Sequence, residues 1–107
     1  MVAATIPAEN EGVQIFEGIR KHIQSFEEIL KVHDDMSVLL MNSTERVWIR
    51  KMELVSPWHI RIDGDNSNGH RVSILAHIHS VMVEIIIESS PLISTKNKHS
   101  ITFTHSC

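Results

Sequence analysis

Histidine and cysteine are the residues of this chain best suited to chemistry, and a group of them lies at its C-terminal end. The 107 residues include eight histidines and one cysteine. His99, His105 and Cys107 all have odd numbers, so a regular strand would point them to one side. Imidazole and thiolate are ligands that Zn²⁺ prefers, which makes these three residues a candidate metal site. The alternative is a chain end that only carries polar residues.

A second histidine pair, His77 and His79, depends on the local structure for any metal-binding role. Residues i and i+2 share one face of a strand and could chelate an ion together. On a helix they lie about 200° apart, which prevents chelation. We predict a helix for this segment, and we therefore interpret both histidines as polar residues that face solvent.

The sequence contains no signature of catalysis. There is no G-x-S-x-G nucleophile elbow, and Gly64 and Gly69 lack the Gly-Lys-Ser/Thr that completes a phosphate loop. Cys107 has histidine neighbours, but a C-terminal residue is difficult to shield from water. We predict a protein that is not an enzyme and that uses no cofactor.

Composition and charge narrow the class of partner. The chain has 10 basic and 13 acidic residues, a formal charge of −3, and no cluster of positive charge of the kind that binds nucleic acid. Its aliphatic runs, such as Ile85 to Ile87, are far shorter than a membrane-spanning helix. A single cysteine suits a reducing compartment, so we expect a cytoplasmic or nuclear protein without nucleic-acid or membrane contacts.

Periodicity predicts the elements that would position these residues. We interpret residues 1–10 as a flexible leader and residues 11–107 as one α+β domain. Spacings of three and four among apolar residues predict a helix over 11–33 that covers the domain's own sheet or, alternatively, pairs with a partner helix. Its apolar stripe consists of Phe16, Ile19, Ile23, Phe26 and Leu30, widened by Ile15 and Ile29. Alternating patterns predict strands over 46–55, 58–63 and 99–105, and a β-branched run predicts a buried strand over 83–87. A further short apolar run lies at 36–41.

The segment 70–81 fits two structures. Val72, Ile74, Ala76 and Ile78 alternate as in a strand. On a helical wheel, Ile74, Leu75, Ile78, Val81 and Met82 instead fall within an arc of about 120°. We favour the helix. The element order α, β, β, α, β, β then predicts a two-layer sandwich of ferredoxin-like character, with two helices packed on one face of a four- to five-stranded sheet.

Residues 58–105 resemble the ACT-like domain, a small regulatory and dimerisation module. The segments that carry the resemblance are the strand HIRID, the loop DNSNG, the helix HRVSILAHIHSV and the strands VEIIIESS and SITFT. In that family a glycine after the first strand approaches a ligand or a neighbouring subunit, and Gly69 matches it. The resemblance implies a ligand site at Asp63, Asn68, Gly69 and His70. The family's second helix and last strand would have to come, in permuted order, from segments 11–33 and 46–55.

Taken together, these features predict a non-enzymatic interaction module that regulates or scaffolds a partner. We expect a homodimer that forms through a sheet edge, with Ser100–Thr104 as the candidate edge strand, and possible binding of another protein. The candidate interface residues are Trp48, Trp58, Ile101 and Phe103. Two alternatives stay open: a domain that senses a small amino-acid-like molecule, and a metal-binding protein that uses the C-terminal histidines and cysteine.

Overall fold

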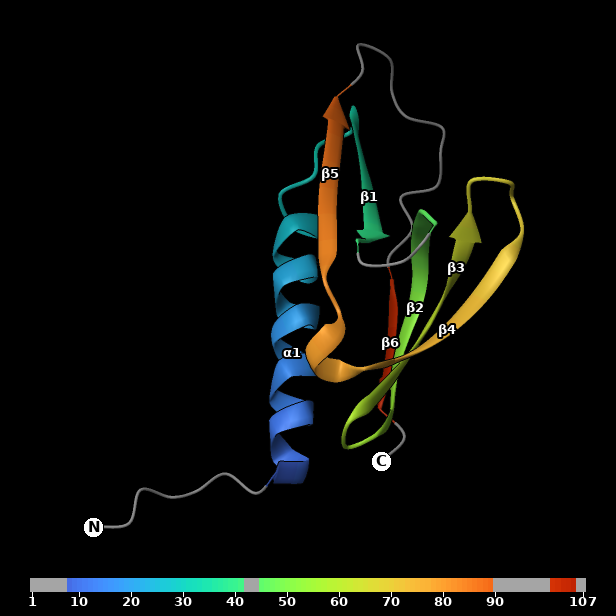
Figure 1. Cartoon of the computed structure of the whole chain (residues 1–107). Coiled ribbons are helices and arrows are strands. Elements are labelled where there is room, and N and C mark those ends of the chain that lie inside the picture. The colour runs from blue at the N-terminus through green and yellow to red at the C-terminus, as the bar shows by residue number, and fades with distance from the viewer. Residues whose placement is uncertain (1–7, 42–44, 90–100, 106–107) are drawn as a thin grey trace.

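The computed structural model describes residues 8–41, 45–89 and 101–105. One helix, α1 (Ala8–Glu27), lies beside a six-stranded sheet (Figure 1). The strands are β1 (Asp34–Leu40), β2 (Val47–Ser56), β3 (His59–Asn66), β4 (Arg71–His77), β5 (Val83–Ser89) and β6 (Thr102–His105). A single 3₁₀ turn, η1 (Ile78–Ser80), connects β4 to β5.

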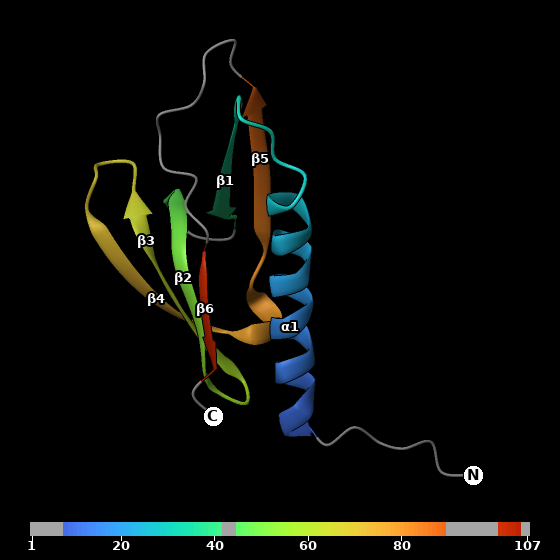
Figure 2. The ribbon, with the colours of Figure 1, turned by 180° about the vertical axis from the view of Figure 1, so that it is seen from behind.

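The sheet is antiparallel except at β6. Its main strand order is β4-β3-β2-β1-β5, and β6 pairs in parallel with β2. On one side β2 pairs with β3; on the other it pairs with β1 at Val47 and Trp48 and with β6 from Lys51 to Leu54. This arrangement leaves β4 and β5 at the two ends of the sheet (Figure 2).

The core fills the space between α1 and one face of the sheet. Alternate residues of β2 and β3 point to this face, because successive side chains of a strand point to opposite sides. Phe16 and Ile23 from the helix meet them and are almost completely buried. The other buried members of the cluster are Val38, Leu40, Val47, Ile49, Met52, Leu54, Ile60, Ile62, Ile78 and Ile101.

The helix is shorter at its C-terminal end than the apolar stripe predicts. It begins at Ala8 and ends at Glu27, whereas the pattern predicted Glu11 to His33. After Glu27 the backbone tightens, since the amides of Ile29 and Leu30 donate to carbonyls three residues earlier, at 3.2 and 3.3 Å. The Asp34 carboxylate then accepts from the Lys31 amide at 3.0 Å, which completes the turn into β1. Ile29 is consequently exposed.

The helix predicted over 70–81 is wrong: this segment forms β4 and η1. Seven consecutive residues, Arg71 to His77, pair with β3. Val72, Ile74 and Ala76 are half-buried on the core side. Leu75 and Met82, which the helical arc would have buried, are 66% and 63% exposed. Long-range pairing with β3 therefore decides the structure of a segment whose local pattern fits either element.

The predicted two-helix, ferredoxin-like sandwich is wrong for the same reason. The described residues hold one helix and six strands, so no second helix covers the sheet. The strands predicted over 46–55, 58–63 and 83–87 do form, as β2, β3 and β5. The resemblance to the ACT-like domain stays a prediction, but the helix it implies over 70–81 is absent and Gly69 lies in a hairpin turn.

Two glycines of α1 give the first test of this packing. A Cβ on Gly12 would lie 1.7 Å from the carbonyl oxygen of Pro57, whereas a Cβ on Gly18 would meet nothing within 4 Å. Alanine is favoured over glycine by about 1 kcal/mol within a helix. We expect Gly18→Ala to raise the free energy of unfolding by up to about that amount and Gly12→Ala to lower it. Urea denaturation of both variants measures this, and stabilisation by Gly12→Ala would contradict the contact.

Two phenylalanines of the same helix give the second test. Phe16 is 1% exposed and packs edge-on against Phe103, with ring centroids 6.1 Å apart. Phe26 is only half-buried and packs on His22. We expect Phe16→Ala to lower the free energy of unfolding by about 3–5 kcal/mol. Phe26→Ala should cost less than half as much, and equal losses in chemical denaturation would show that this placement of the helix is wrong.

Candidate functional site

The face of the sheet away from the core carries charged and polar side chains on β2, β3 and β4. Successive side chains of a strand point to opposite faces, so these residues lie on the face opposite the buried isoleucines of β3. The residues concerned are Arg50, Lys51, Glu53, Arg61, Asp63, Asp65, Arg71 and Ser73. The outer face of the sheet is therefore a candidate surface for binding a polar ligand.

Ion pairs connect the strands of this face. Glu53 accepts from Arg61 at 2.8 Å and lies 3.7 Å from the Lys51 ammonium nitrogen. Arg61 also lies 3.5 Å from Asp63. Arg50 pairs with Asp65 on the next strand. Because these side chains are partly exposed, each pair contributes about 0–1 kcal/mol to stability, and their main effect is to orient the charges.

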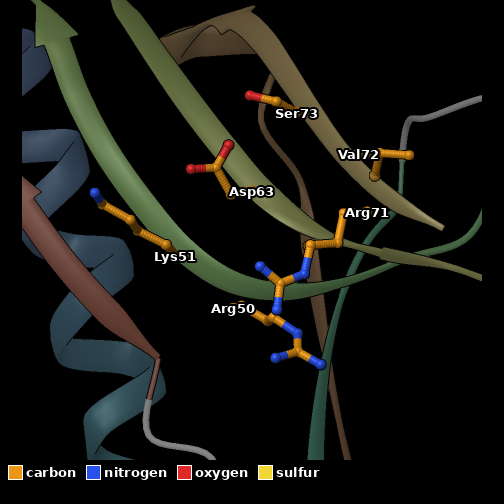
Figure 3. Close-up of a pocket in the computed structure, with 7 residues that line it drawn as sticks. Arg50, Lys51, Asp63, Arg71, Val72 and Ser73 are labelled. Atoms are coloured by element: carbon orange, nitrogen blue, oxygen red, sulfur yellow. The ribbon is translucent and has the colours of Figure 1, made fainter. Parts of the chain in front are cut away.

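A hollow of about 420 Å³ opens beside these pairs (Figure 3). Its lining consists of Arg50, Lys51, Asp63, Gly64, Arg71, Val72 and Ser73. Figure 3 shows the side chains of Arg50 and Arg71 extending into one part of it, while Asp63 and Ser73 lie in another. The hollow therefore has one part with two guanidinium groups and another part where Asp63 and Ser73 lie together with Lys51, which is the partner of Asp63 across β2 and β3.

A β-bulge and a glycine shape this hollow. Pairing between β2 and β3 shifts register between Ile49 and Lys51, so Arg50 is an extra residue without a partner on β3. The bulge brings the β2 backbone close to Gly64, where a Cβ would lie 2.2 Å from the Trp48 carbonyl oxygen. Only glycine allows this approach, and the bulge directs Arg50 toward the hollow.

Three of the four predicted ligand residues lie in the β3–β4 turn and do not line the hollow. The Asn66 side chain holds this turn, because its Oδ1 accepts from the amides of Asn68 and His70 at 3.0 Å each. Gly69 has φ = 78°, a backbone conformation that favours glycine. The glycine that suggested a ligand site is thus required by the hairpin turn. Asp63, in contrast, does line the hollow.

Trp58, His59, His77 and His79 form an aromatic cluster at the other end of β4. The rings of His77 and His79 stack with centroids 5.3 Å apart, and each stacks on Trp58 at 5.9 and 5.8 Å. His77 Nδ1 accepts from the His79 amide at 3.2 Å, which fixes its ring. His79 Nε2 lies 3.3 Å from a carboxylate oxygen of Glu11. The cluster thus connects the start of α1 to the end of β4.

The remaining interface candidates lie in different surroundings. Trp48 is half-buried on β2, and the Arg46 guanidinium lies 5.9 Å from its ring. Ile101 is buried in the core, and Phe103 packs on Phe16. Ile101 and Phe103 therefore offer a partner little surface, whereas Trp58 is half-buried within the exposed histidines.

The proposed metal ligands are only partly described. His99 and Cys107 lie outside the described residues. His105 is the last residue of β6 and is exposed, with its ring centroid 6.4 Å from that of Phe16. Among the residues that the structure describes, no three His, Cys, Asp or Glu side chains converge to hold a metal ion.

Sequence reasoning missed Arg50, Lys51, Arg71 and Ser73 as a group. The dipeptide Arg50-Lys51 is too short to count as a basic patch, and a bulge cannot be seen in a sequence. One signal was present: the glycine-bearing turn between two alternating segments is typical of a β-hairpin. A hairpin reading pairs Asp65 with Arg71 and Asp63 with Ser73, as the structure does.

The fold and the site define a small α+β domain with a polar outer sheet face. A scan against models of known protein families and searches of curated proteins and of solved structures found no match to this chain. Within residues 8–41, 45–89 and 101–105, no helix has the length and apolar character needed to cross a membrane.

The turn provides a test of its structural role. Asn66 is 9% exposed, and its Nδ2 also donates to Glu45 at 3.2 Å. We expect Asn66→Ala to lower the free energy of unfolding by about 1–3 kcal/mol, because the amides of Asn68 and His70 both lose their acceptor. Asn68→Ala at an exposed neighbouring position should change it by less than about 0.5 kcal/mol. If thermal or urea denaturation shows equal effects, Asn66 does not organise the turn.

Proposed function

We propose that this chain is a non-enzymatic self-association module that forms a homodimer by antiparallel pairing of β4 with β4 of a second copy. The observation that supports the proposal is the open edge of β4. Within the described residues, β4 pairs only with β3, so its other edge presents unpaired amides and carbonyls. Open edges of this kind are templates for pairing with another chain.

The composition of β4 favours pairing. Natural proteins protect edge strands with lysine, proline or inward charges. The sequence Arg71–His77 contains no lysine, proline or inward charge; its charged residue, Arg71, is at the first position, and Leu75 is 66% exposed on the outer face. A strand that lacks such protection and exposes a large apolar side chain is suited to a β-sheet interface.

One register pairs all seven residues of β4 with a second copy. A two-fold axis at Ile74 sets Val72 opposite Ala76 and extends the apolar inner face without a break. On the outer face, Ser73 lies opposite Leu75, and Arg71 lies opposite His77. In this register no lysine or arginine lies opposite Arg71.

The other end of the sheet is less suited to self-pairing. β5 carries Glu84 and Glu88 on its outer face. An axis at Ile86 would set Glu84 opposite Glu88 twice, and like charges directly opposite each other destabilise a strand pair. Charge therefore favours β4 over β5. The expected edge strand, Ser100–Thr104, overlaps β6, which among the described residues also pairs on one side only, with β2; it has four residues for pairing, whereas β4 has seven.

We further propose that the dimer acts in the cytoplasm or nucleus, where it would regulate or scaffold a partner protein. The single cysteine supports a reducing compartment. Two seven-residue strands contribute less than the roughly 1,200–2,000 Å² that a stable interface buries. We therefore expect association to depend on concentration, which suits a regulated module.

A matched pair of variants tests this interface. Leu75 and Met82 are almost equally exposed, but only Leu75 lies on β4. We expect sedimentation velocity between roughly 5 and 500 µM to show a monomer–dimer equilibrium. Leu75→Lys should weaken dimerisation at least about tenfold, because each copy would then carry a lysine next to the two-fold axis at Ile74, close to Arg71 of the other copy.

Met82→Lys adds the same charge outside the strand and should leave the dissociation constant unchanged. Circular dichroism of both variants checks that the monomer stays folded. A concentration-independent monomer mass for the unmodified chain would refute the proposal. Weakening by Met82→Lys without an effect of Leu75→Lys would place any interface elsewhere.

A further inference from the structure

We propose that the hollow between β2, β3 and β4 binds a small phosphomonoester that carries hydroxyl groups. The phosphate lies at Arg50 and Arg71, and the hydroxyl groups lie at Lys51, Asp63 and Ser73. The site belongs to a single chain and does not require the proposed dimer. The argument depends on the charge of the lining, on the ion pairs around it and on the size of the hollow.

The lining of the hollow carries more positive than negative charge. Three basic side chains, Arg50, Lys51 and Arg71, line it together with one carboxylate, that of Asp63. The whole chain, in contrast, has 10 basic and 13 acidic residues. The hollow is therefore a positive region on a negative protein, and a concave region of one charge concentrates ions of the other sign. A phosphomonoester carries about −1.5 to −2 charges near pH 7, which suits this excess.

The carboxylates beside the hollow already have basic partners. Asp65 accepts from Nε of Arg50, and Asp63 lies 3.5 Å from Arg61. The two terminal nitrogens of Arg50 have no partner among the described residues. Arg71 lines the hollow but forms no ion pair with any residue that the structure describes, although Asp65 is its partner in the register. Both guanidinium groups therefore keep donors for an external anion.

Two guanidinium groups from different strands favour a phosphate over a carboxylate. The bulge of β2 directs Arg50 to the part of the hollow that Arg71 also reaches (Figure 3). A carboxylate is planar, and a single guanidinium occupies both of its oxygens through two parallel hydrogen bonds. A phosphomonoester has three terminal acceptor oxygens that are not in one plane, so it can accept from two guanidinium groups that approach from different sides.

The other part of the hollow has balanced charge and both kinds of hydrogen-bonding group. Asp63 is paired with Lys51 across β2 and β3 and with Ser73 across β3 and β4. A further charged group of the ligand would meet a like charge here, either the ammonium of Lys51 or the carboxylate of Asp63. A hydroxyl group is uncharged and both donates and accepts, so it suits a lining of ammonium, carboxylate and hydroxyl groups.

Spacing and volume set the size of the ligand. Asp63 and Ser73 lie two residues along the strands from Asp65 and Arg71, which corresponds to about 7 Å. A chain of about three or more carbon atoms between the phosphate and the outermost hydroxyl covers this distance. The volume of about 420 Å³ lies toward the small end of the range for ligand sites. The class of ligand is therefore a phosphorylated polyol or sugar of a few carbon atoms.

Titration of the full chain with simple probes tests the site. Backbone amide shifts in ¹⁵N-correlated NMR spectra report weak binding, and the probes are glycerol 3-phosphate, propyl phosphate, glycerol and inorganic sulfate. We expect glycerol 3-phosphate to bind with a millimolar dissociation constant and to shift the amides of Gly64, Val72 and Ser73. Propyl phosphate has the same carbon chain without the hydroxyl groups and should bind at least about threefold more weakly. Glycerol should cause no saturable shift.

Variants of exposed residues assign the groups. Arg71→Gln should reduce the affinity for both phosphate esters at least about tenfold, because it removes a charged donor pair. Arg20→Gln, the same change on the surface of α1, should leave both affinities unchanged. Ser73→Ala should weaken glycerol 3-phosphate about threefold and leave propyl phosphate unchanged. Arg71 and Ser73 are exposed, so both variants should stay folded, which well-dispersed spectra confirm.

Each remaining outcome overturns the proposal or one part of it. Absence of saturable shifts with both esters, or an unchanged affinity in Arg71→Gln, refutes the phosphate position. Equal affinities for sulfate and glycerol 3-phosphate show an unspecific attraction of anions. Equal affinities for the two esters, or no effect of Ser73→Ala, refute the hydroxyl positions. A chain that is monomeric at every concentration but binds glycerol 3-phosphate refutes the dimer and leaves this site intact, and a dimer without binding does the reverse.

Discussion

The pairing of β3 with β4 positions the side chains that these two strands contribute to the candidate site. Seven residue pairs join the two strands, and the buried Asn66 side chain fixes the turn between them. This hairpin carries Asp63, Arg71 and Ser73 to one hollow. At its other end, the same pairing brings His77 against Trp58, and the Ile78 amide donates to the Trp58 carbonyl at 2.7 Å. Without this hairpin there would be neither an open β4 edge nor a hollow.

Close backbone approaches hold the hairpin in the fold. Gly12 lets α1 lie against the carbonyl of Pro57 in the β2–β3 turn, and Gly64 lets the bulged part of β2 approach β3. Both contacts exclude any larger residue, because a Cβ would fall within 2.2 Å of a carbonyl oxygen. Glycine lowers the intrinsic stability of the helix or strand that contains it, but at both positions it permits close backbone packing. This packing fixes the helix at Gly12 and the bulged part of β2 at Gly64.

The sequence permits prediction of the elements whose pattern is local and strong. The stripe of α1, the alternation in β2 and β3 and the β-branched run of β5 identify these elements, although the helix ends at Glu27 and not at His33. Segment 70–81 is different, since its apolar residues satisfy both a strand and a helix, and only pairing with β3 selects the strand. The helix end at Glu27 likewise depends on the turn that leads to β1. Reading the glycine-bearing turn as a hairpin would have corrected the fold class.

The candidate site was less predictable than the fold for a physical reason. Its residues come from three strands, and Arg50 reaches the hollow only because a bulge adds a residue to β2. A bulge depends on the backbone of two strands together, so no spacing in one strand reveals it. Asp63 was identified, but as part of the ligand site that the family resemblance implies around Gly69. The structure instead associates it with Ser73, its partner across the sheet.

Arg71, Val72 and Ser73 line the hollow and also belong to the edge strand β4, so one strand carries both features. In the proposed dimer, Arg71 lies opposite His77 of the second copy. A change at the hollow that moves β4 would therefore alter the paired edge. Pairing at the edge would alter the hollow by the same coupling free energy, because coupling between two sites is reciprocal.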